Sequence, residues 1–145
     1  MVMGRKAMSV EQQNVAALKS AYEMWDSNKE QAFAHWMALF ADNVQFASLA
    51  NGAPGMEFSC AGCNKNDIQK YFERLAKDWE MISFETYQFI AEGDNVVMRG
   101  RCSWRNRKTK KVVETPKADF FVMKNGQIVN FFEFYDTAAA IAAAH

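Results

Sequence analysis

The sequence predicts an α+β protein, in which helices of the first half cover one face of a mostly antiparallel sheet made by the second half. Three observations carry this prediction. Apolar residues recur at helical spacing in the first half, and from Met81 onward they recur with the period of two that is typical of strands. The last two predicted strands are apolar on both faces, so the sheet needs a cover on each side.

Length and composition suit one folded domain. The chain has 145 residues, of which 50% are apolar and 14% aromatic, so it can bury one sizeable core. Its 17 Lys and Arg residues equal its 17 Asp and Glu residues, which argues against binding of nucleic acid or membranes through bulk charge. No apolar run reaches the roughly 18 residues of a membrane span, and the first residues lack the apolar stretch of a signal peptide. We expect a single cytoplasmic domain over residues 1–145, with a flexible tail over about residues 1–9.

The three cysteines do not predict a disulfide framework. Their number is odd and the chain shows no export signal. Cys60 and Cys63 form a C-x-x-C pair, which is typical of redox or metal sites when it opens a helix of a thioredoxin-like unit or meets a second pair of ligands. Neither context is evident, because the only histidines are His35 and His145. We therefore expect no metal and no cofactor, while a redox role for Cys60 and Cys63 stays open.

Two helices are predicted before the first strand. Ser9-Val-Glu-Gln12 has the form of a capping box, and apolar residues at helical spacing continue the helix from about Val10 to Trp25. After a break, a second helix with an aromatic stripe ends near residues 41–43. Helices therefore occupy most of the first third of the chain.

A small hairpin and a third helix are predicted next. Residues 44–50 form a strand, residues 51–55 contain the Gly and Pro of a turn, and residues 56–60 form a second short strand. Asn64 then opens a helix whose apolar positions follow i, i+3, i+4, i+7 and i+11. These positions are Ile68, Tyr71, Phe72, Leu75 and Trp79, and we interpret them as core.

The remaining chain predicts four consecutive antiparallel strands. They cover residues 82–91, 96–107, 112–123 and 127–136, and the turns between them are rich in Gly, Asn and Lys. Asp136 is a good N-cap, and the alanine-rich residues after it favour a short terminal helix over about residues 137–145.

The strand over residues 96–107 has one apolar and one basic face. If the following turn is centred on residues 108–109, pairing with the next strand places Met98 opposite Asp119 and gives this carboxylate apolar neighbours. The basic face lacks interleaved aromatic residues, so it does not predict nucleic-acid binding. The same register pairs Cys102 with Thr115 and Trp104 with Val113.

The final hairpin has two possible registers, and they place Asp119 and Glu133 differently. A two-residue turn on Asn125 and Gly126 would send the two carboxylates to opposite faces of the sheet. A three-residue loop, with Gly126 left-handed in a G1 bulge, pairs Asp119 with Phe131 and sets Glu133 diagonal to Asp119 on the same face. Local sequence does not decide between them.

Both faces of the last two strands are apolar in either register. An antiparallel sheet that is wet on one side should alternate between apolar and polar residues, so both faces need a cover. The helices can cover one face, and a second subunit is the simplest cover for the other. We predict a homodimer through this outer face, which carries Phe120, Val122, Phe132 and Phe134.

The order of the elements and two motifs near the end of the chain resemble a known superfamily. The motifs are D-F-F-V-M-K-N-G-Q-I-V from Asp119 and F-E-F-Y-D from Phe132. They resemble the nuclear-transport-factor-2-like superfamily, and within it the SnoaL-like and ketosteroid-isomerase-like branch, over about residues 12–140. The resemblance implies a curved, mostly antiparallel sheet wrapped around three helices, a cone-shaped α+β barrel of the cystatin-like type. It also implies an apolar pocket at the open end of the cone and dimers through the outer sheet face.

The resemblance gives two residues candidate roles. Asp119 matches the carboxylic acid that ketosteroid isomerases use as an oxyanion-hole donor, which favours the bulged register because that position faces the cavity in the family. Glu133 matches the acid on the last strand of limonene epoxide hydrolase. The general base of the isomerases would fall on Ala47, and the Arg-x-Asp of the hydrolase is Gly100-Arg-Cys102 here. The chain thus keeps one member of each catalytic set and completes neither.

Two carboxyl groups close together in an apolar site cannot both ionise without cost, so one should hold a proton near neutral pH while the other acts as a base. Our hypothesis assigns Glu133 as the base and protonated Asp119 as the electrophilic donor, with exchangeable roles. The substrate would be a small apolar carbonyl, polyketide-like or epoxide-like compound, and no cofactor is needed. Candidate ligand-binding residues are Tyr22, Trp25, Met98, Cys102, Trp104, Phe121, Phe131 and Tyr135.

Simpler interpretations stay open for both carboxylates. Asp119 can be a strand-end carboxylate bonded to backbone or to Lys117, and Glu133 can pair with a basic residue at the sheet rim. Three functional classes follow: an enzyme of the isomerase, cyclase, hydratase or hydrolase type, a non-catalytic carrier of an apolar ligand, and a dimeric interaction module. A separation of the two carboxyl groups beyond about 8 Å would exclude the pair.

Overall fold

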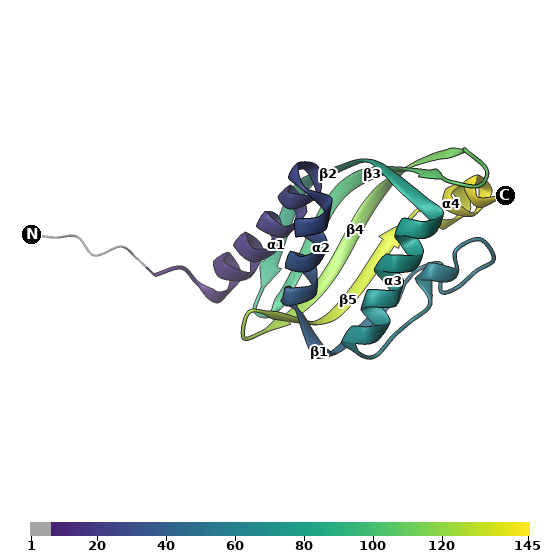
Figure 1. The fold of residues 1–145 in the computed structure, drawn as a ribbon. Helices are drawn as coiled ribbons and strands as arrows, with labels where there is room; N and C mark the ends of the chain where they lie inside the picture. Colours follow the sequence, from purple (N-terminus) through teal and green to yellow (C-terminus); the bar gives the residue numbers. More distant parts are fainter. Residues whose placement is uncertain (1–6) are drawn as a thin grey trace, which may run out of the picture.

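Residues 7–145 are described by a computed structural model, and they form five strands, four α-helices and one 3-10 helix (Figure 1). None of these helices is long and apolar enough to cross a membrane. Most of the tail predicted over residues 1–9 lies outside the described residues. The elements are α1 (Val10–Ser27), α2 (Lys29–Leu39), β1 (Phe40–Ser48), the 3-10 helix η1 (Glu57–Ser59), α3 (Lys65–Asp78), β2 (Trp79–Glu92), β3 (Asn95–Asn106), β4 (Val112–Lys124), β5 (Gln127–Tyr135) and α4 (Thr137–Ala144).

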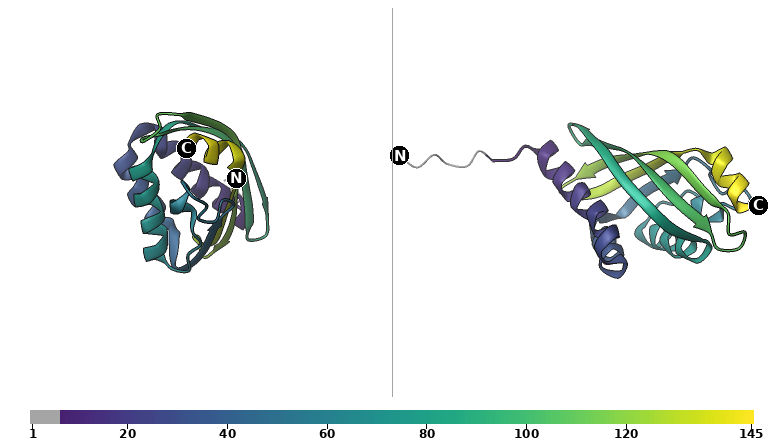
Figure 2. Two further views of the ribbon diagram at one scale, coloured as in Figure 1. Left: turned by 90° about the vertical axis from the view of Figure 1, so that its right-hand side faces the viewer. Right: turned by 90° about the horizontal axis from the view of Figure 1, so that it is seen from above.

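The five strands make one curved sheet with the order β1-β5-β4-β3-β2. Strands β2 to β5 are consecutive antiparallel neighbours, as the sequence predicts. β1 pairs parallel with β5 and forms one edge of the sheet. The sheet curves around α1, α2 and α3, which lie on its concave side (Figure 2). The predicted α+β class with a mostly antiparallel sheet is therefore confirmed.

Local capping signals place the starts of the helices. The side chain of Ser9 accepts the backbone N–H of Gln12, and the Gln12 side chain accepts that of Ser9, which confirms the predicted capping box. Asn28 caps α2, Asn64 caps α3 and Asp136 caps α4, each through its side-chain oxygen. The predicted break after the first helix and the predicted terminal helix are both confirmed.

The hairpin predicted over residues 44–60 is wrong. The first strand pairs with β5 instead, and Phe46 of β1 lies opposite Phe131. Residues 57–59 form η1 rather than a second strand, after turns in which Gly52 and Gly55 adopt positive φ. Among the described residues, β1 contacts the segment that follows it through a single antiparallel bridge, between Phe46 and Gly62. Pairing with β5 lets β1 bury its apolar side chains in the main core, which an isolated hairpin could not do.

The end of the second helix also differs from the prediction. α2 ends at Leu39, and the chain enters β1 at Phe40, so residues 41–43 belong to the strand. Phe40 lies four residues after Trp36 and so continues the helical spacing of the aromatic residues of α2, which makes the spacing alone predict a longer helix. Its side chain is 1% exposed, because the strand places it opposite Ile128 in the core.

The pairing of β3 with β4 confirms the predicted register, since Met98 lies opposite Asp119. Side chains of β4 alternate between the two faces of the sheet. Phe121 is 1% exposed on the concave face, whereas Phe120 is 38% exposed on the outer face. The two other predicted pairs, Cys102 with Thr115 and Trp104 with Val113, are also present.

The final hairpin combines a two-residue turn with a bulge. Asn125 and Gly126 both have positive φ, 51° and 76°, as a type I′ turn requires. The bulge lies inside β5, where Val129 is the extra residue, and not at Gly126. The extra residue shifts the register of all later pairs by one.

This shift decides the faces of the two carboxylates. Asp119 lies directly opposite Glu133, not opposite Phe131, and both side chains point to the concave side. The prediction that a two-residue turn would separate them is wrong, because the bulge at Val129 restores the shared face. The three-residue loop is also wrong, although the shared face that it predicts is correct.

The outer face of the sheet carries the apolar side chains predicted to meet a second subunit. Phe120 is 38% and Phe134 is 45% exposed. The rings of Phe132 and Phe134 contact each other, with centroids 4.6 Å apart. Val122 and Phe132 are half-buried beside them.

Candidate functional site

A cavity of about 540 Å³ lies between the helices and the concave face of the sheet. This volume falls within the roughly 300–1,000 Å³ of small-molecule sites. Its walls are mostly aromatic, and its floor is formed by β4 and β5. All three charged side chains that are buried in residues 7–145 line it, namely Lys117, Asp119 and Glu133.

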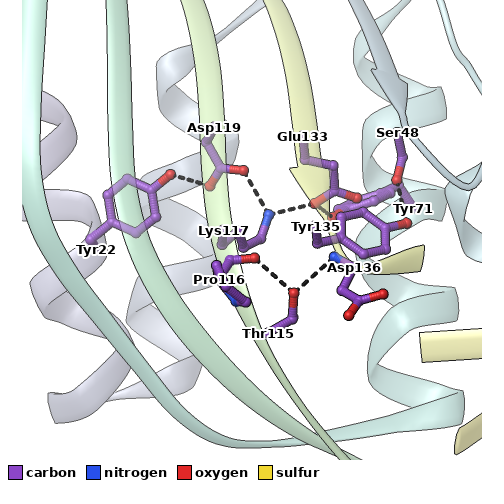
Figure 3. Close-up of polar contacts among 10 residues, drawn as sticks. All are labelled: Tyr22, Ser48, Tyr71, Thr115, Pro116, Lys117, Asp119, Glu133, Tyr135 and Asp136. Atoms are coloured by element: carbon purple, nitrogen blue, oxygen red, sulfur yellow. Dashed lines mark hydrogen bonds and ion pairs between the residues drawn. The ribbon is translucent and has the colours of Figure 1, made fainter. Parts of the chain in front are cut away.

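Lys117 joins the two carboxylates at the floor of the cavity (Figure 3). Its Nζ donates to Oδ1 of Asp119 at 2.6 Å and to Oε2 of Glu133 at 2.8 Å. Lys117 and Asp119 share a face because they are two residues apart on β4, and the bulge in β5 brings Glu133 opposite. Since both carboxylates bind one nitrogen, their oxygens lie well inside the limit of about 8 Å set for a cross-strand pair.

Two tyrosines extend this arrangement to the helices. Tyr22 of α1 donates its hydroxyl to Oδ2 of Asp119 at 2.5 Å, and Tyr71 of α3 donates to Oε2 of Glu133 at 2.9 Å. The resulting chain of five side chains crosses the floor from α1 to α3 (Figure 3). We refer to Tyr22, Asp119, Lys117, Glu133 and Tyr71 as the floor network.

The two carboxylates of the floor network are not equivalent. Both oxygens of Asp119 accept a hydrogen bond, one from Lys117 and one from Tyr22. Glu133 accepts both of its hydrogen bonds on Oε2, and its buried Oε1 has no donor within the described part of the chain. The hydrogen-bonding capacity of Glu133 is therefore only partly used by the described residues, whereas that of Asp119 is used on both oxygens.

Charge and burial perturb the titration of these groups. The network holds one ammonium and two carboxyl groups, so full ionisation would leave one excess negative charge in an apolar surround. Burial raises the pKa of Asp119, Lys117 opposes this shift, and Glu133 adds to it. Burial alone would lower the pKa of Lys117, but the charges of Asp119 and Glu133 raise it above its ordinary value. Lys117 is therefore held as an ammonium ion.

The tyrosines of the network stay protonated. Burial, followed by the charge of Asp119, raises the pKa of Tyr22 well above its ordinary value. Burial and the charge of Glu133 do the same for Tyr71. Both hydroxyl groups are therefore hydrogen-bond donors across the physiological pH range.

Seven of the eight residues predicted to bind a ligand line the cavity. The exception is Met98, which is fully buried in the core beside Asp119. Tyr22 is part of the floor network as well as of the wall. The seven are Tyr22, Trp25, Cys102, Trp104, Phe121, Phe131 and Tyr135.

Two lining residues carry further polar groups. The hydroxyl of Tyr135 lies 2.7 Å from that of Ser48, and burial raises the pKa of Tyr135 to about 12. Burial likewise raises the pKa of the Cys102 thiol to about 11. Both groups are neutral near pH 7, so neither adds charge to the cavity.

Sequence reasoning missed three polar residues of the site. The sequence suggests Lys117 only as one possible hydrogen-bond partner of Asp119, although its position two residues before Asp119 on an alternating strand predicts a shared face. Tyr71 lies in the apolar stripe of α3, and this pattern predicts a core residue without a polar role. Ser48 carries no signal in the local sequence that points to Tyr135.

Cys60 and Cys63 lie outside the cavity as exposed, free thiols. The Cys63 thiol points to Oδ2 of Asp67 at 3.8 Å. Across residues 7–145, no group of three His, Cys, Asp or Glu side chains is placed to hold a metal ion.

Comparisons with known proteins agree with this architecture. The family model for the SnoaL-like domain matches residues 18–131. The structure of an NTF2-like protein from Burkholderia thailandensis is 27% identical, with a TM-score of 0.77 and coverage of 95% of this chain and 99% of that chain. No curated protein sequence matches the chain.

Two more distant structures share the fold. A protein proposed to be a SnoaL-like polyketide cyclase, from a Jannaschia species, is 18% identical, with a TM-score of 0.75 and coverage of 97% of both chains. A protein with a ketosteroid isomerase-like fold from Catenulispora acidiphila, in complex with trimethylamine, is 13% identical, with a TM-score of 0.70 and coverage of 88% of this chain and 91% of that chain. Because the family model matches residues 18–131, which are most of this chain, the chain belongs to the SnoaL-like domain family.

Proposed function

We propose that this SnoaL-like protein is a cofactor-independent acid/base enzyme of the isomerase, cyclase, hydratase or hydrolase type. Its substrate would be a small apolar carbonyl, polyketide-like or epoxide-like compound held in the aromatic cavity. The observation that carries the proposal is the floor network, in which Asp119 and Glu133 lie opposite each other and share Lys117. Structural neighbours named as a proposed polyketide cyclase and as ketosteroid isomerase-like support the same reaction class.

The carboxyl pair can take up and return one proton. Glu133, which lines the floor of the cavity, would remove a proton from carbon beside the carbonyl group. Asp119, whose pKa burial raises, would be the second proton carrier of the pair.

A non-catalytic carrier of an apolar ligand is the alternative. It is favoured by the aromatic walls of the cavity and by the fact that both carboxylates already have partners within the protein. An interaction module is less favoured, because side chains leave a cavity of about 540 Å³. Carrier and enzyme differ in one respect, namely that only the enzyme moves a proton of its ligand.

We also propose a homodimer through the outer face of the sheet. The exposure of Phe120 and Phe134 supports it, since contiguous exposed apolar side chains are uncommon on monomers. Such an interface leaves the cavity on the opposite face free for the ligand.

Deuterium exchange tests the proposed chemistry without knowledge of the natural substrate. Small apolar ketones such as 2-tetralone are incubated with the protein in D2O, and incorporation at the α-carbon is measured by mass spectrometry. Wild-type protein should accelerate exchange, and Glu133→Gln and Asp119→Asn should each reduce it by about 10²–10⁴-fold. Matched controls are Glu114→Gln and Asp94→Asn, whose carboxylates lie on the surface in the ion pairs with Arg101 and Lys124.

The controls should exchange like wild type. Ketone binding without any exchange by wild type would identify a carrier. Equal exchange by all variants would exclude the carboxyl pair as the catalytic group.

A further inference from the structure

The Lys117 ammonium group has a donor that the protein does not use. An ammonium ion carries three N–H groups, and two of them bind Asp119 and Glu133. For the third, residues 7–145 offer no acceptor within hydrogen-bond distance. Lys117 lines the cavity, and it is 9% exposed, against 3% for Asp119 and 3% for Glu133. The unused donor is therefore available to a ligand in the cavity.

We propose that Lys117 binds the carbonyl oxygen of a neutral, enolisable ketone and stabilises the enolate that forms when the carboxyl pair removes the α-proton. This inference rests on the proposed function and changes one role within it. Asp119 has a donor on each oxygen and holds Lys117, whereas Lys117 is the catalytic residue that touches the substrate oxygen.

The surroundings keep Lys117 fixed in place and charged. Two carboxylates hold Nζ from both sides, and the rings of Phe84 and Tyr135 lie 5.9 Å and 5.8 Å from it. A preorganised charged donor in a water-poor site is the arrangement that stabilises a developing oxyanion most strongly. The same carboxylates oppose the neutral amine that attack on a carbonyl carbon would need, so the site is unsuited to Schiff-base formation.

The charge of the network sets the substrate class. With both carboxyl groups ionised beside the Lys117 ammonium, the network carries one excess negative charge, so an anionic ligand would add a second negative charge to a buried site. A neutral ketone adds none. Its enolate forms only as a carboxylate is neutralised by the α-proton, so the total charge of the site does not change during the step.

The proposed step balances in protons and electrons. The α-C–H bond breaks, its proton moves to Glu133, and the electron pair moves to the carbonyl oxygen. The enolate oxygen then accepts the third N–H of Lys117, which keeps its proton throughout. Return of the proton from Glu133 to carbon regenerates both the carboxylate and a ketone, with no oxidant or reductant.

An enolate mimic tests this role through binding alone. The probe is 4-nitrophenol, and its absorption spectrum reports the fraction bound as phenolate at a pH below the pKa of the free phenol. Wild type should bind it with its proton passed to the carboxyl pair and its phenolate oxygen on Lys117. Lys117→Met should lower the bound phenolate-to-phenol ratio by about 10²–10³-fold, the usual effect of removing one oxyanion donor. Lys124→Met, which removes a surface ammonium paired with Asp94, should leave the ratio unchanged.

A second variant distinguishes loss of the Lys117 donor from misfolding. Lys117→Met combined with Asp119→Asn removes one positive and one negative charge, so the net charge of the floor stays the same as in wild type. It should lose the phenolate signature as Lys117→Met does. A wild-type protein that leaves the probe as phenol, or a phenolate signature that survives in either Lys117 variant, overturns the proposal.

Two further outcomes separate this proposal from the proposed function. If exchange of 2-tetralone requires Glu133 while the phenolate signature survives in Lys117→Met, the role of Lys117 fails and the acid/base function stands. If wild type exchanges no ketone, the proposed function itself fails. Borohydride treatment of wild type with 2-tetralone should leave the protein mass unchanged, whereas a reduced adduct on Lys117 would overturn the ammonium role.

Discussion

Lys117→Met is the substitution whose effect on stability can be worked most fully from the structure. Methionine keeps an unbranched apolar stem but removes the ammonium, so Asp119 and Glu133 each lose a charge-assisted hydrogen bond. Hydrogen bonds to charged groups contribute about 1.5–3 kcal/mol each, and breaking a buried ion pair costs about 3–5 kcal/mol. Either route predicts a loss of about 4 kcal/mol in the free energy of unfolding at neutral pH.

The size of this loss should depend on pH. Burial already raises the pKa of Asp119 in the folded protein, and Lys117 opposes that shift. Without Lys117 the folded-state pKa rises further. A raised folded-state pKa gives stability that is fully present below the unfolded pKa and is lost as pH rises through the folded pKa. The variant should therefore regain part of its stability on acidification from neutral pH toward about pH 4, the ordinary range of carboxyl groups.

Urea denaturation at neutral and mildly acidic pH measures both effects. With a slope of about 2 kcal/mol per molar urea, the midpoint at neutral pH should fall by about 2 M. The control is Lys124→Met, whose ammonium pairs with Asp94 at the surface, and it should lose at most about 1 kcal/mol. Equal losses in the two variants, or a loss for Lys117→Met that grows on acidification, would refute the reasoning.

Tyr22→Phe removes the hydroxyl that donates to Asp119, so it should cost about 1–3 kcal/mol in urea denaturation. It should also raise the pKa of Asp119 further in an NMR titration, and an unchanged titration would argue against this hydrogen bond. Phe120→Lys combined with Phe134→Lys should give a folded monomer in analytical ultracentrifugation, whereas an unchanged dimer would place the interface elsewhere. Deleting Val129 removes the extra residue of the bulge and leaves an unbroken ladder, so ketone exchange should persist. If the deletion variant folds but no longer catalyses exchange, the bulge does more than place Glu133 opposite Asp119.

The sequence predicted those parts of the fold that local signals specify. Ser9, Asn64 and Asp136 mark helix starts because their side chains bond the backbone within the next turn. The register of β3 with β4 was predictable because the two strands adjoin a short turn. The partner of β1 was not, since β5 lies far along the chain and pairing between them depends on the assembled sheet.

One feature that forms the candidate site, the bulge in β5, cannot be predicted from the local sequence. Asn125 and Gly126 form the turn that their identity predicts, but the bulge at Val129 has no local signal, because valine is an ordinary strand residue. The register that places Glu133 on the concave face depends on how the side chains of the whole sheet pack, and not on the residues around Val129. Lys117 shows the opposite case, since strand alternation from Asp119 was sufficient to place it on the same face.

The pH dependence of α-proton exchange tests the central claim most directly, because it reports which group removes the proton. Exchange by wild type should rise with increasing pH as the carboxyl pair, in which burial raises the pKa of Asp119, loses a proton, and it should then level off. Glu133→Gln should abolish this rise. Burial places the pKa of Cys102 at about 11 and that of Tyr135 at about 12. An exchange rate that instead keeps rising into this alkaline range would contradict a carboxylate base.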